Sequence, residues 1–433
     1  MKNKSYLKLE TKDMPRYNLL IGATSSGCGK TTFTMGLLMA LRERGLKVQP
    51  FKCGPDYIDT KFHERVCGRP SINLDTFMAT PEHVHELFLR YGFDADICVV
   101  EGMMGLFDGY DRDHGSSAEI ARVLDIPVVL VVDAKSAAYS TAALLQGFVH
   151  FREDIRVAGV VFNRVGSERH CQMLQQVCDD LRITCFGYLP KTKTLEQGSR
   201  YLGLDFSEET SVSELMTMVE EHVDVEKLLS VISRQSVGSV ASVESINPID
   251  YNLSILVARN AESFSFMYQE YLDRYRKIAF FDPETEMPQF EGIDLLYLPG
   301  GYPEKHLEAL VSNEACRKAI KDFAERGGRI IAECGGMMYL CQSIVTDEGE
   351  YPMCGVLPFV ITARMADRKL SLGYRRFELD GREYRGHEFH YTRFAEVTPS
   401  SATQVFDAKG NAVDTPVFRY KNVLASYTHL YNV

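Results

Sequence analysis

The stretch Gly22-Ala-Thr-Ser-Ser-Gly-Cys-Gly-Lys-Thr-Thr32 determines the fold, because it joins a short apolar run to a long helical pattern. A strand, a glycine-rich turn and a helix in this order predict a P-loop, in which backbone N–H groups surround phosphate oxygens. The N-terminus of the helix adds the positive end of its dipole. We expect Lys30 to neutralise phosphate charge and the Thr31 hydroxyl to bind Mg²⁺.

This loop departs from the strict P-loop pattern, because Thr24 stands where that pattern has glycine. It is similar instead to the variant loop of dethiobiotin synthetase-like enzymes, in which a glycine two residues earlier opens the turn. Asn163 ends a later predicted strand, where it either reads a purine edge or caps the strand. The residues predicted to bind ATP are Ser26, Gly27, Cys28, Gly29, Lys30, Thr31, Thr32 and Asn163.

Acidic side chains follow two other predicted strands. Asp56 and Asp59 lie in a turn after residues 48–52, and Glu101 follows the strand at 97–100. The carboxyl ends of parallel strands carry the ligand sites of α/β sheets, and Mg²⁺ prefers oxygen ligands. We therefore assign Thr31, Asp56 and Glu101 to a Mg²⁺ site, while the alternative for either aspartate is a turn-stabilising hydrogen bond.

Outward from the loop, short apolar runs alternate with helical patterns, which predicts a doubly wound α/β domain around a parallel sheet. The first helix is expected at 31–44, with Gly45 closing its end. The expected strands of this domain are 18–21, 48–52, 97–100, 128–132 and 158–162.

A serine-rich segment near residues 230–247 interrupts this order. The pattern then resumes with expected strands at 253–258, 277–281, 295–298 and 329–332. We therefore predict two α/β domains, 1–235 and 250–433, joined by a linker at 236–249.

A second site is expected at Cys334, which lies between a predicted strand and a helix in Glu333-Cys-Gly-Gly-Met337. Such an elbow exposes a nucleophile, and the glycines after it leave room for a substrate. A thiol at the N-terminus of a helix is also expected to have a lowered pKa. The alternative, an inert buried thiol, leaves the two glycines without a purpose.

A nucleophile also needs an oxyanion hole and a base. Gly300 and Gly301 follow another predicted strand, and we expect their N–H groups to form the oxyanion hole together with that of Gly335. His429, near the end of the sequence, is the candidate base. The second site is thus expected to release a group by attack of Cys334 on a carbonyl carbon.

Composition and charge exclude several classes of function. The 433 residues carry a formal net charge of −11, which argues against a broad nucleic-acid surface. No stretch is long and apolar enough to span a bilayer, and residues 1–16 do not read as a signal peptide. The 11 cysteines lack metal-finger spacing, so we expect reduced thiols and a cytoplasmic protein. His387 and His390 lack the spacing of a helical zinc pair and would point to opposite faces of a strand, so no metal site is expected there.

The two sites on one chain resemble those of the cobyrinate a,c-diamide synthase family, and the resemblance covers essentially the whole chain. No single motif carries it, but the motifs are specific in combination. They are residues 22–32, Lys52-Cys-Gly-Pro-Asp-Tyr-Ile-Asp59, Val100-Glu-Gly-Met-Met-Gly-Leu-Phe-Asp108, Leu298-Pro-Gly-Gly-Tyr-Pro-Glu304, Glu333-Cys-Gly-Gly-Met337 and Arg385-Gly-His-Glu-Phe-His-Tyr391.

The resemblance implies an ATP-dependent ligase of cobalamin biosynthesis that takes nitrogen from glutamine. Its N-terminal domain, similar to dethiobiotin synthetase, would transfer the γ-phosphoryl group of ATP to a carboxylate of the substrate, and ammonia would displace the phosphate. Its C-terminal domain would be a class I glutamine amidotransferase, in which Cys334, activated by His429, releases that ammonia. The family amidates the a and c acetate side chains of the corrin precursor. Tyr57 and Asp59 are assigned to positioning the substrate and ammonia.

The expected ligands are therefore ATP, Mg²⁺, L-glutamine and cobyrinic acid or a related tetrapyrrole acid, without nucleic acid or membrane, and a homodimer is left open. One departure is Tyr431, which stands where many class I amidotransferases complete a triad with glutamate. The branch that includes cobyrinate and cobyric acid synthases generally lacks this glutamate, so the departure agrees with the resemblance.

Three alternatives stay open. The same chemistry could act on hydrogenobyrinic acid, nickel-sirohydrochlorin or cobyric acid precursors. The chain could instead be a P-loop switch ATPase of the chromosome-partitioning type, or a degenerate amidotransferase that only binds a partner. The presence of both Cys334 and His429 argues against the last two.

Overall fold

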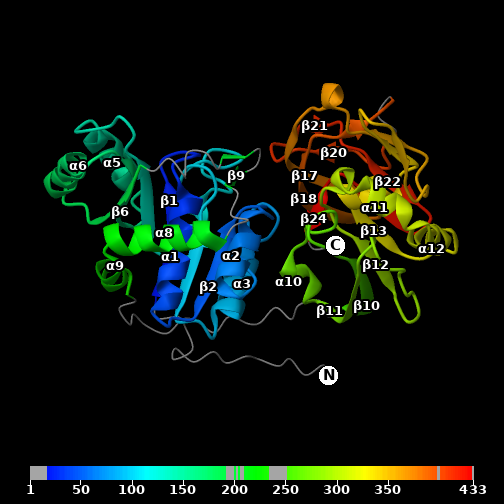
Figure 1. Ribbon diagram of the computed structural model, residues 1–433, viewed down its shortest axis with the longest axis horizontal. Coiled ribbons are helices and arrows are strands. Elements are labelled where there is room, and N and C mark those ends of the chain that lie inside the picture. The colour runs from blue at the N-terminus through cyan, green and yellow to red at the C-terminus, as the bar shows by residue number, and fades with distance from the viewer. Residues whose placement is uncertain are drawn as a thin grey trace. The chain divides into compact units, whose positions relative to one another are not determined.

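The computed structural model describes residues 17–191, 199–200, 203–204, 209–233, 251–396 and 400–431. The chain divides into two units, residues 1–246 and 247–433, which are described separately. The predicted linker at 236–249 lies outside the described residues. Figure 1 shows the N-terminal unit in blue to green and the C-terminal unit in green to red.

A seven-stranded sheet forms the centre of the N-terminal unit, and every paired neighbour in it is parallel. Its strands are buried on both faces, which explains their nearly continuous apolar sequences. In spatial order they are β3 (Ile72–Leu74), β2 (Val48–Cys53), β4 (Ile97–Glu101), β1 (Tyr17–Ala23), β5 (Val128–Asp133), β6 (Val157–Val165) and β7 (Cys185–Pro190).

Helices connect these strands, as the alternating sequence pattern predicts. The long helix α1 (Lys30–Glu43) packs against the sheet, and α8 (Glu209–His222) lies beside it (Figure 1). Gly45 follows the end of α1 with φ 79°, and its N–H donates to the carbonyl of Arg42. The other helices of this unit are α2 (Asp59–Cys67), α3 (Pro81–Gly92), α4 (Ser117–Leu124), α5 (Thr141–His150), α6 (Glu168–Leu181) and α9 (Val225–Ile232).

The C-terminal unit is built on a six-stranded sheet and a smaller antiparallel sheet. In spatial order the first holds β11 (Tyr275–Phe281), β10 (Tyr251–Ala258), β12 (Leu295–Leu298), β13 (Ile330–Glu333), β23 (Val423–Ser426) and β22 (Val417–Tyr420). The second holds β21 (Ala412–Val413), β20 (Val405–Phe406), β17 (Ser371–Leu379), β18 (Arg382–His390) and β24 (His429–Tyr431).

A third, four-stranded sheet and several short helices complete this unit. The sheet holds β15 (Glu350–Pro352), β14 (Ser343–Val345), β16 (Val360–Thr362) and β19 (Arg393–Phe394). The helices are α10 (Gln269–Leu272), α11 (Leu307–Ser312), α12 (Glu314–Glu325) and α13 (Gly335–Leu340), together with the 3-10 turns η2 (Pro303–Lys305) and η3 (Met365–Asp367).

The predicted fold class, two α/β domains with a parallel N-terminal sheet, is confirmed. The antiparallel sheet of β17, β18 and β24 was not predicted, because its strands are partly exposed and carry mixed polar sequences. Among the described residues, none of the helices combines the length and the hydropathy that crossing a bilayer requires.

Candidate active sites

The P-loop follows β1 and ends at the first residue of α1. Gly29 caps the helix with φ 93°, a conformation that favours glycine. A Cβ atom at this position would lie 2.0 Å from the Asn163 amide nitrogen, so a larger residue would not fit. Asn163 donates from that nitrogen to the carbonyl of Cys28 at 2.9 Å, and its side-chain Oδ1 accepts from the Arg164 N–H. Asn163 therefore braces the loop from the end of β6, and its amide is already engaged there.

Lys30 is placed to meet an anion. Its ammonium donates to the carbonyl of Met104, and it makes no ion pair within the part of the chain that the structure describes. Burial lowers the pKa of Lys30, and the neighbouring Lys52 lowers it further. A cation held beside the amides at the start of α1 without an acidic partner suits the phosphates of a nucleotide.

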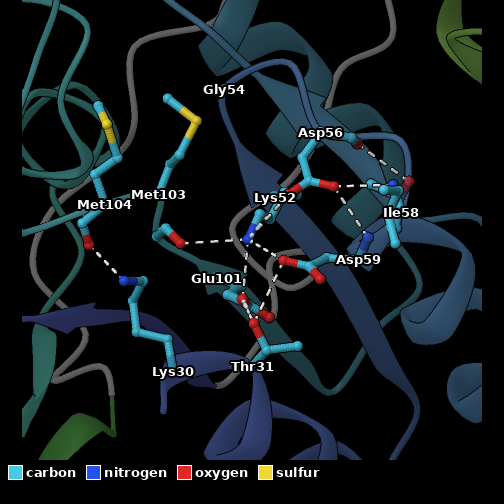
Figure 2. A network of polar contacts seen from close by, with 12 residues as sticks. Lys30, Thr31, Lys52, Gly54, Asp56, Ile58, Asp59, Glu101, Met103 and Met104 are labelled. Carbon is cyan, nitrogen blue, oxygen red and sulfur yellow. Dashed lines mark hydrogen bonds and ion pairs between the residues drawn. The ribbon is translucent and has the colours of Figure 1, made fainter. Parts of the chain in front are cut away.

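Three carboxylates surround a lysine to which the sequence motifs assigned no role (Figure 2). Lys52 on β2 is in direct register with Glu101 on β4, so both side chains reach the same edge of the sheet. The Lys52 ammonium lies 2.6 Å from Asp59, 2.9 Å from Glu101 and 3.6 Å from Asp56. Each of these groups stands at or just after the carboxyl end of a parallel strand, where α/β sheets place their chemistry.

The residues assigned to Mg²⁺ are brought together only in part. The Thr31 hydroxyl donates to Glu101 at 2.7 Å and lies 3.4 Å from Asp59 (Figure 2). Asp56 instead uses one oxygen to accept the N–H groups of Ile58 and Asp59, which is the turn-stabilising alternative. These hard oxygen atoms fit Mg²⁺, and the carboxylate of Asp59, which was assigned to positioning the substrate and ammonia, lies among them.

The buried groups of this cluster differ in the direction in which their pKa values are shifted. Burial raises the pKa of Glu101, but Lys52 and a hydrogen bond from His63 outweigh it and hold that pKa well below its usual range. Burial lowers the pKa of Lys52, and the three carboxylates more than reverse this. Burial and the nearby Asp56 raise the pKa of Asp59. Glu101 is thus firmly ionised.

His63 is a second residue that sequence reasoning missed. Its ring is fully buried, with Nε2 2.8 Å from Glu101 and Nδ1 3.0 Å from the Ser71 hydroxyl. The ring therefore fixes the orientation of the Glu101 carboxylate. Its position one turn into α2 carries no pattern that links it to Glu101. Tyr57, assigned to substrate positioning, is buried in the turn that precedes α2.

Cys334 occupies a strained elbow between β13 and α13. Its backbone has φ 46° and ψ −111°, which a residue with a side chain rarely adopts. The Cys334 N–H donates to the carbonyl of Ser426 on the neighbouring β23, and its carbonyl accepts from Met338. The elbow predicted from the sequence is therefore present, held by the strand on one side and the helix on the other.

His429 and the glycine loop meet directly. A Cβ atom at Gly300 would lie 2.2 Å from Cε1 of His429, so the ring packs on the bare backbone of the loop. A Cβ atom at Gly335 would lie 3.1 Å from the nitrogen of Gly301, which places the loop beside the elbow. The strands β12, β13 and β23 are neighbours, and the loop, the elbow and the segment leading to His429 all follow their carboxyl ends. The structure thus gathers the predicted oxyanion-hole glycines and base around the elbow.

The expected lowering of the Cys334 pKa is wrong. Burial raises this pKa well above its usual value, and the nearby Glu304 raises it further. The helix that follows has only six residues and is wholly buried, so its dipole does not compensate for the loss of water around a thiolate. Cys334 therefore rests as a thiol and needs a base to become a nucleophile.

His429 is held by groups that were not predicted. Its ring stacks on that of His387, with centroids 5.0 Å apart and planes inclined by 16°, because β24 pairs with β18. Burial lowers the pKa of His429 well below its usual value, and His387 and His390 lower it further. His429 is therefore a neutral imidazole that can accept a proton.

Glu333 also holds β24, the strand that begins at His429. It ends β13 just before Cys334, and its carboxyl accepts the N–H of Leu430 at 3.1 Å and the hydroxyl of Tyr297 at 2.8 Å. Burial raises the pKa of Glu333 to about 8, although both hydrogen bonds lower it. Glu333 thus ties Leu430, the residue after His429, to β13, the strand that ends at Cys334.

His387 stacks on His429, whereas His390 has other partners. His390 stacks on Tyr427 with centroids 3.7 Å apart, and its Nε2 lies 2.6 Å from Glu388. Glu388 also accepts from Arg375 at 2.7 Å. Burial raises the pKa of Glu388, but the hydrogen bond and charge of His390, together with Arg375, bring it down to about 2. No cluster of metal ligands occurs in the described ranges.

Comparisons with known protein families match both units. A family model described as a CobQ/CobB/MinD/ParA nucleotide binding domain matches residues 19–204, which include the P-loop and the acidic cluster. A model described as a CobB/CobQ-like glutamine amidotransferase domain matches residues 240–432, which include Cys334 and His429. The first match shows that the N-terminal unit is a nucleotide-binding domain.

Curated relatives match along nearly the whole chain. A hydrogenobyrinate a,c-diamide synthase of Brucella anthropi is 39% identical over 95% of this chain and 97% of its own. A cobyrinate a,c-diamide synthase of Caldanaerobacter subterraneus subsp. tengcongensis is 37% identical over 95% and 94%. The cobyrinate a,c-diamide synthase of Listeria monocytogenes serotype 4b is 38% identical over 95% and 96%.

Proposed function

Because the chain belongs to the family of cobyrinate and hydrogenobyrinate a,c-diamide synthases, which are ATP- and glutamine-dependent amidating ligases, we propose that it amidates the a and c acetates of cobyrinic acid. Residues 1–235 carry the synthase half and residues 250–433 the amidotransferase half. The observation that supports this most directly is the coexistence of a phosphate-binding loop facing carboxylates and a glycine loop that contacts both the buried His429 ring and the elbow of Cys334. We place this reaction in the cytoplasm.

The synthase half activates a carboxylate that is otherwise a poor electrophile. ATP binds with its phosphates at the P-loop and Lys30, and the γ-phosphoryl group passes to a substrate carboxylate oxygen, giving an acyl phosphate and ADP. Ammonia then attacks the acyl carbon and releases phosphate. Thr31 and Glu101, with Asp59 or Asp56, would hold Mg²⁺, which neutralises phosphate charge when bound. Lys52 and Lys30 reduce the repulsion between two anions, and Tyr57 with Asp59 positions the substrate and ammonia.

The amidotransferase half generates ammonia at Cys334. The neutral His429 takes the thiol proton as the sulfur attacks the amide carbon of glutamine, and the N–H groups of Gly301 and Gly335 stabilise the oxyanion. The proton on His429 then passes to the leaving nitrogen, so ammonia departs and a glutamyl thioester remains. Water hydrolyses that thioester to glutamate and restores the thiol.

The choice of tetrapyrrole is tested by incubating the purified protein with ATP, Mg²⁺, glutamine and cobyrinic acid and following the product by mass spectrometry. Two successive changes of OH to NH₂ are expected. Glutaminase activity without change in cobyrinic acid would move the proposal to the metal-free or nickel tetrapyrroles. ATP hydrolysis without either activity would favour the switch ATPase instead.

A further inference from the structure

Arg164 is a cationic residue beside the P-loop to which the proposed reaction assigns no role. It follows Asn163 near the end of β6, where the register between β6 and β7 shifts. Its backbone has φ 59°, which a residue with a side chain rarely adopts. Such a conformation persists only where the surrounding structure holds it.

The Arg164 guanidinium makes two contacts that hold this conformation. Its Nη2 donates to the carbonyl of Gly27 in the P-loop at 2.9 Å, and its Nη1 donates to the Asp133 carboxylate at 2.5 Å. Asp133 ends β5 and is in direct register with Asn163 on β6. Arg164 therefore ties the P-loop to the carboxyl ends of two neighbouring strands.

Arg164 and Asn163 together hold two consecutive carbonyls of the loop. Arg164 binds the carbonyl of Gly27, and Asn163 binds the carbonyl of Cys28. Because a trans peptide group is planar, its N–H points away from its carbonyl. Each contact therefore also fixes the direction of the N–H group of the following residue, which is Cys28 in the first case and Gly29 in the second.

These two N–H groups point away from the side chains that hold the carbonyls, and they are available to a ligand. In all the ranges that the structure describes, neither of them donates to an acceptor of the protein. A P-loop binds phosphate oxygens with backbone N–H groups of this kind. Phosphate binding thus needs a direction of the Cys28 and Gly29 N–H groups that side chains from β6 supply.

We infer that Arg164 is a positioning residue of the nucleotide site, which aligns the Cys28 N–H with the phosphates by holding the Gly27 carbonyl. The inference rests on the proposed binding of ATP phosphates at the P-loop, and it does not depend on the choice of tetrapyrrole. The role is not that of a free charge for the nucleotide, because Arg164 already forms an ion pair with Asp133.

The test measures the dissociation constant of ADP for the full-length protein in the presence of Mg²⁺ by isothermal titration calorimetry. Arg164→Gly removes the guanidinium and tolerates φ 59°, so the variant should fold. Its Kd should rise about 10-fold, the change expected when one hydrogen bond to a phosphate is no longer aligned. Arg182→Gly is the matched control, because Arg182 at the end of α6 has a similar φ of 57°. This control should keep the wild-type Kd.

Arg164→Lys separates alignment from charge. Lysine keeps the positive charge, but its single nitrogen cannot replace the two arms of the guanidinium, so the Kd should rise about as much as in Arg164→Gly. The Tm without nucleotide provides a second readout. It should stay near the wild-type value in Arg164→Gly, because relief of the backbone strain offsets the lost contacts, whereas a merely structural role would lower the Tm and leave the Kd unchanged.

A wild-type Kd in Arg164→Gly would overturn the inference. A wild-type Kd in Arg164→Lys would also overturn it, because charge rather than alignment would then account for binding. An equal rise of the Kd in the Arg182→Gly control would do the same. The proposed function fails separately, through a wild-type protein that binds no ADP.

Discussion

Glu333→Gln should change how the stability of the C-terminal unit depends on pH. In the unfolded chain a glutamate loses its proton near its ordinary pKa of 4.5, whereas burial keeps Glu333 protonated in the native protein up to about pH 8. Between these values the native state binds one more proton than the unfolded state, so the free energy of unfolding falls as pH rises. Above about pH 8 the dependence ends.

The magnitude follows from the width of this window. One pH unit corresponds to about 1.36 kcal/mol, so wild type should lose about 2.5 kcal/mol between pH 5 and pH 7 from this group alone. The amide that replaces the carboxyl in the variant cannot titrate, and its carbonyl can still accept the Leu430 N–H. The difference between the Tm of the variant and the Tm of wild type should therefore shift in favour of the variant by about 5–10 °C from pH 5 to pH 7, given about 2–4 °C per kcal/mol in a unit of this size.

Differential scanning calorimetry of both full-length proteins at pH 5 and pH 7 measures this difference. The transition of the N-terminal unit serves as the internal reference, because Glu333 belongs to the other unit. A Tm difference between variant and wild type that stays the same at both pH values would refute the reasoning. It would mean that the carboxyl titrates as it does in the unfolded chain.

Three further substitutions separate the two halves of the reaction. Lys30→Ala should abolish amide synthesis with either nitrogen source, because the phosphates lose their cation; product formation with ammonium chloride would contradict this. Cys334→Ser should abolish glutamine-dependent synthesis and leave ammonia-dependent synthesis intact, and loss of both activities would argue against two separate sites. Gly300→Ala places a methyl group 2.2 Å from Cε1 of His429 and must displace that ring. Its glutaminase kcat should fall by about 10²-fold, as expected for a misplaced catalytic group, with ammonia-dependent synthesis as the control that must not fall.

Much of the first site could be predicted because its parts are local. The P-loop is one continuous stretch, and Glu101 ends a strand whose apolar sequence marks it as central. The contact between Lys52 and Glu101 could not be predicted, because it depends on the register between β2 and β4. Asp56 illustrates a different limit: its position after a strand suggested a metal ligand, and the sequence could not decide between that role and the local hydrogen bonds from Ile58 and Asp59 that use one of its oxygens.

In the second site, too, the local features could be predicted from the sequence and the tertiary contacts could not. The elbow at Cys334 is local and was predicted, whereas the stack of His387 on His429 arises from pairing between β18 and β24, which are distant in sequence. The thiol pKa was misjudged because the sequence shows a helix N-terminus but does not show how completely that helix is buried. Burial is a tertiary property, and here it outweighs the local dipole.

The resting state of Cys334 has a consequence for the lifetime of the enzyme. Peroxide and electrophiles attack thiolates that solvent can reach, and Cys334 is both protonated and only 4% exposed. If, in the proposed reaction, His429 takes the proton of Cys334 only when glutamine fills the site, the thiol becomes reactive only during turnover. Between turnovers, burial and protonation would then protect Cys334 from oxidation in the way that they protect a structural cysteine.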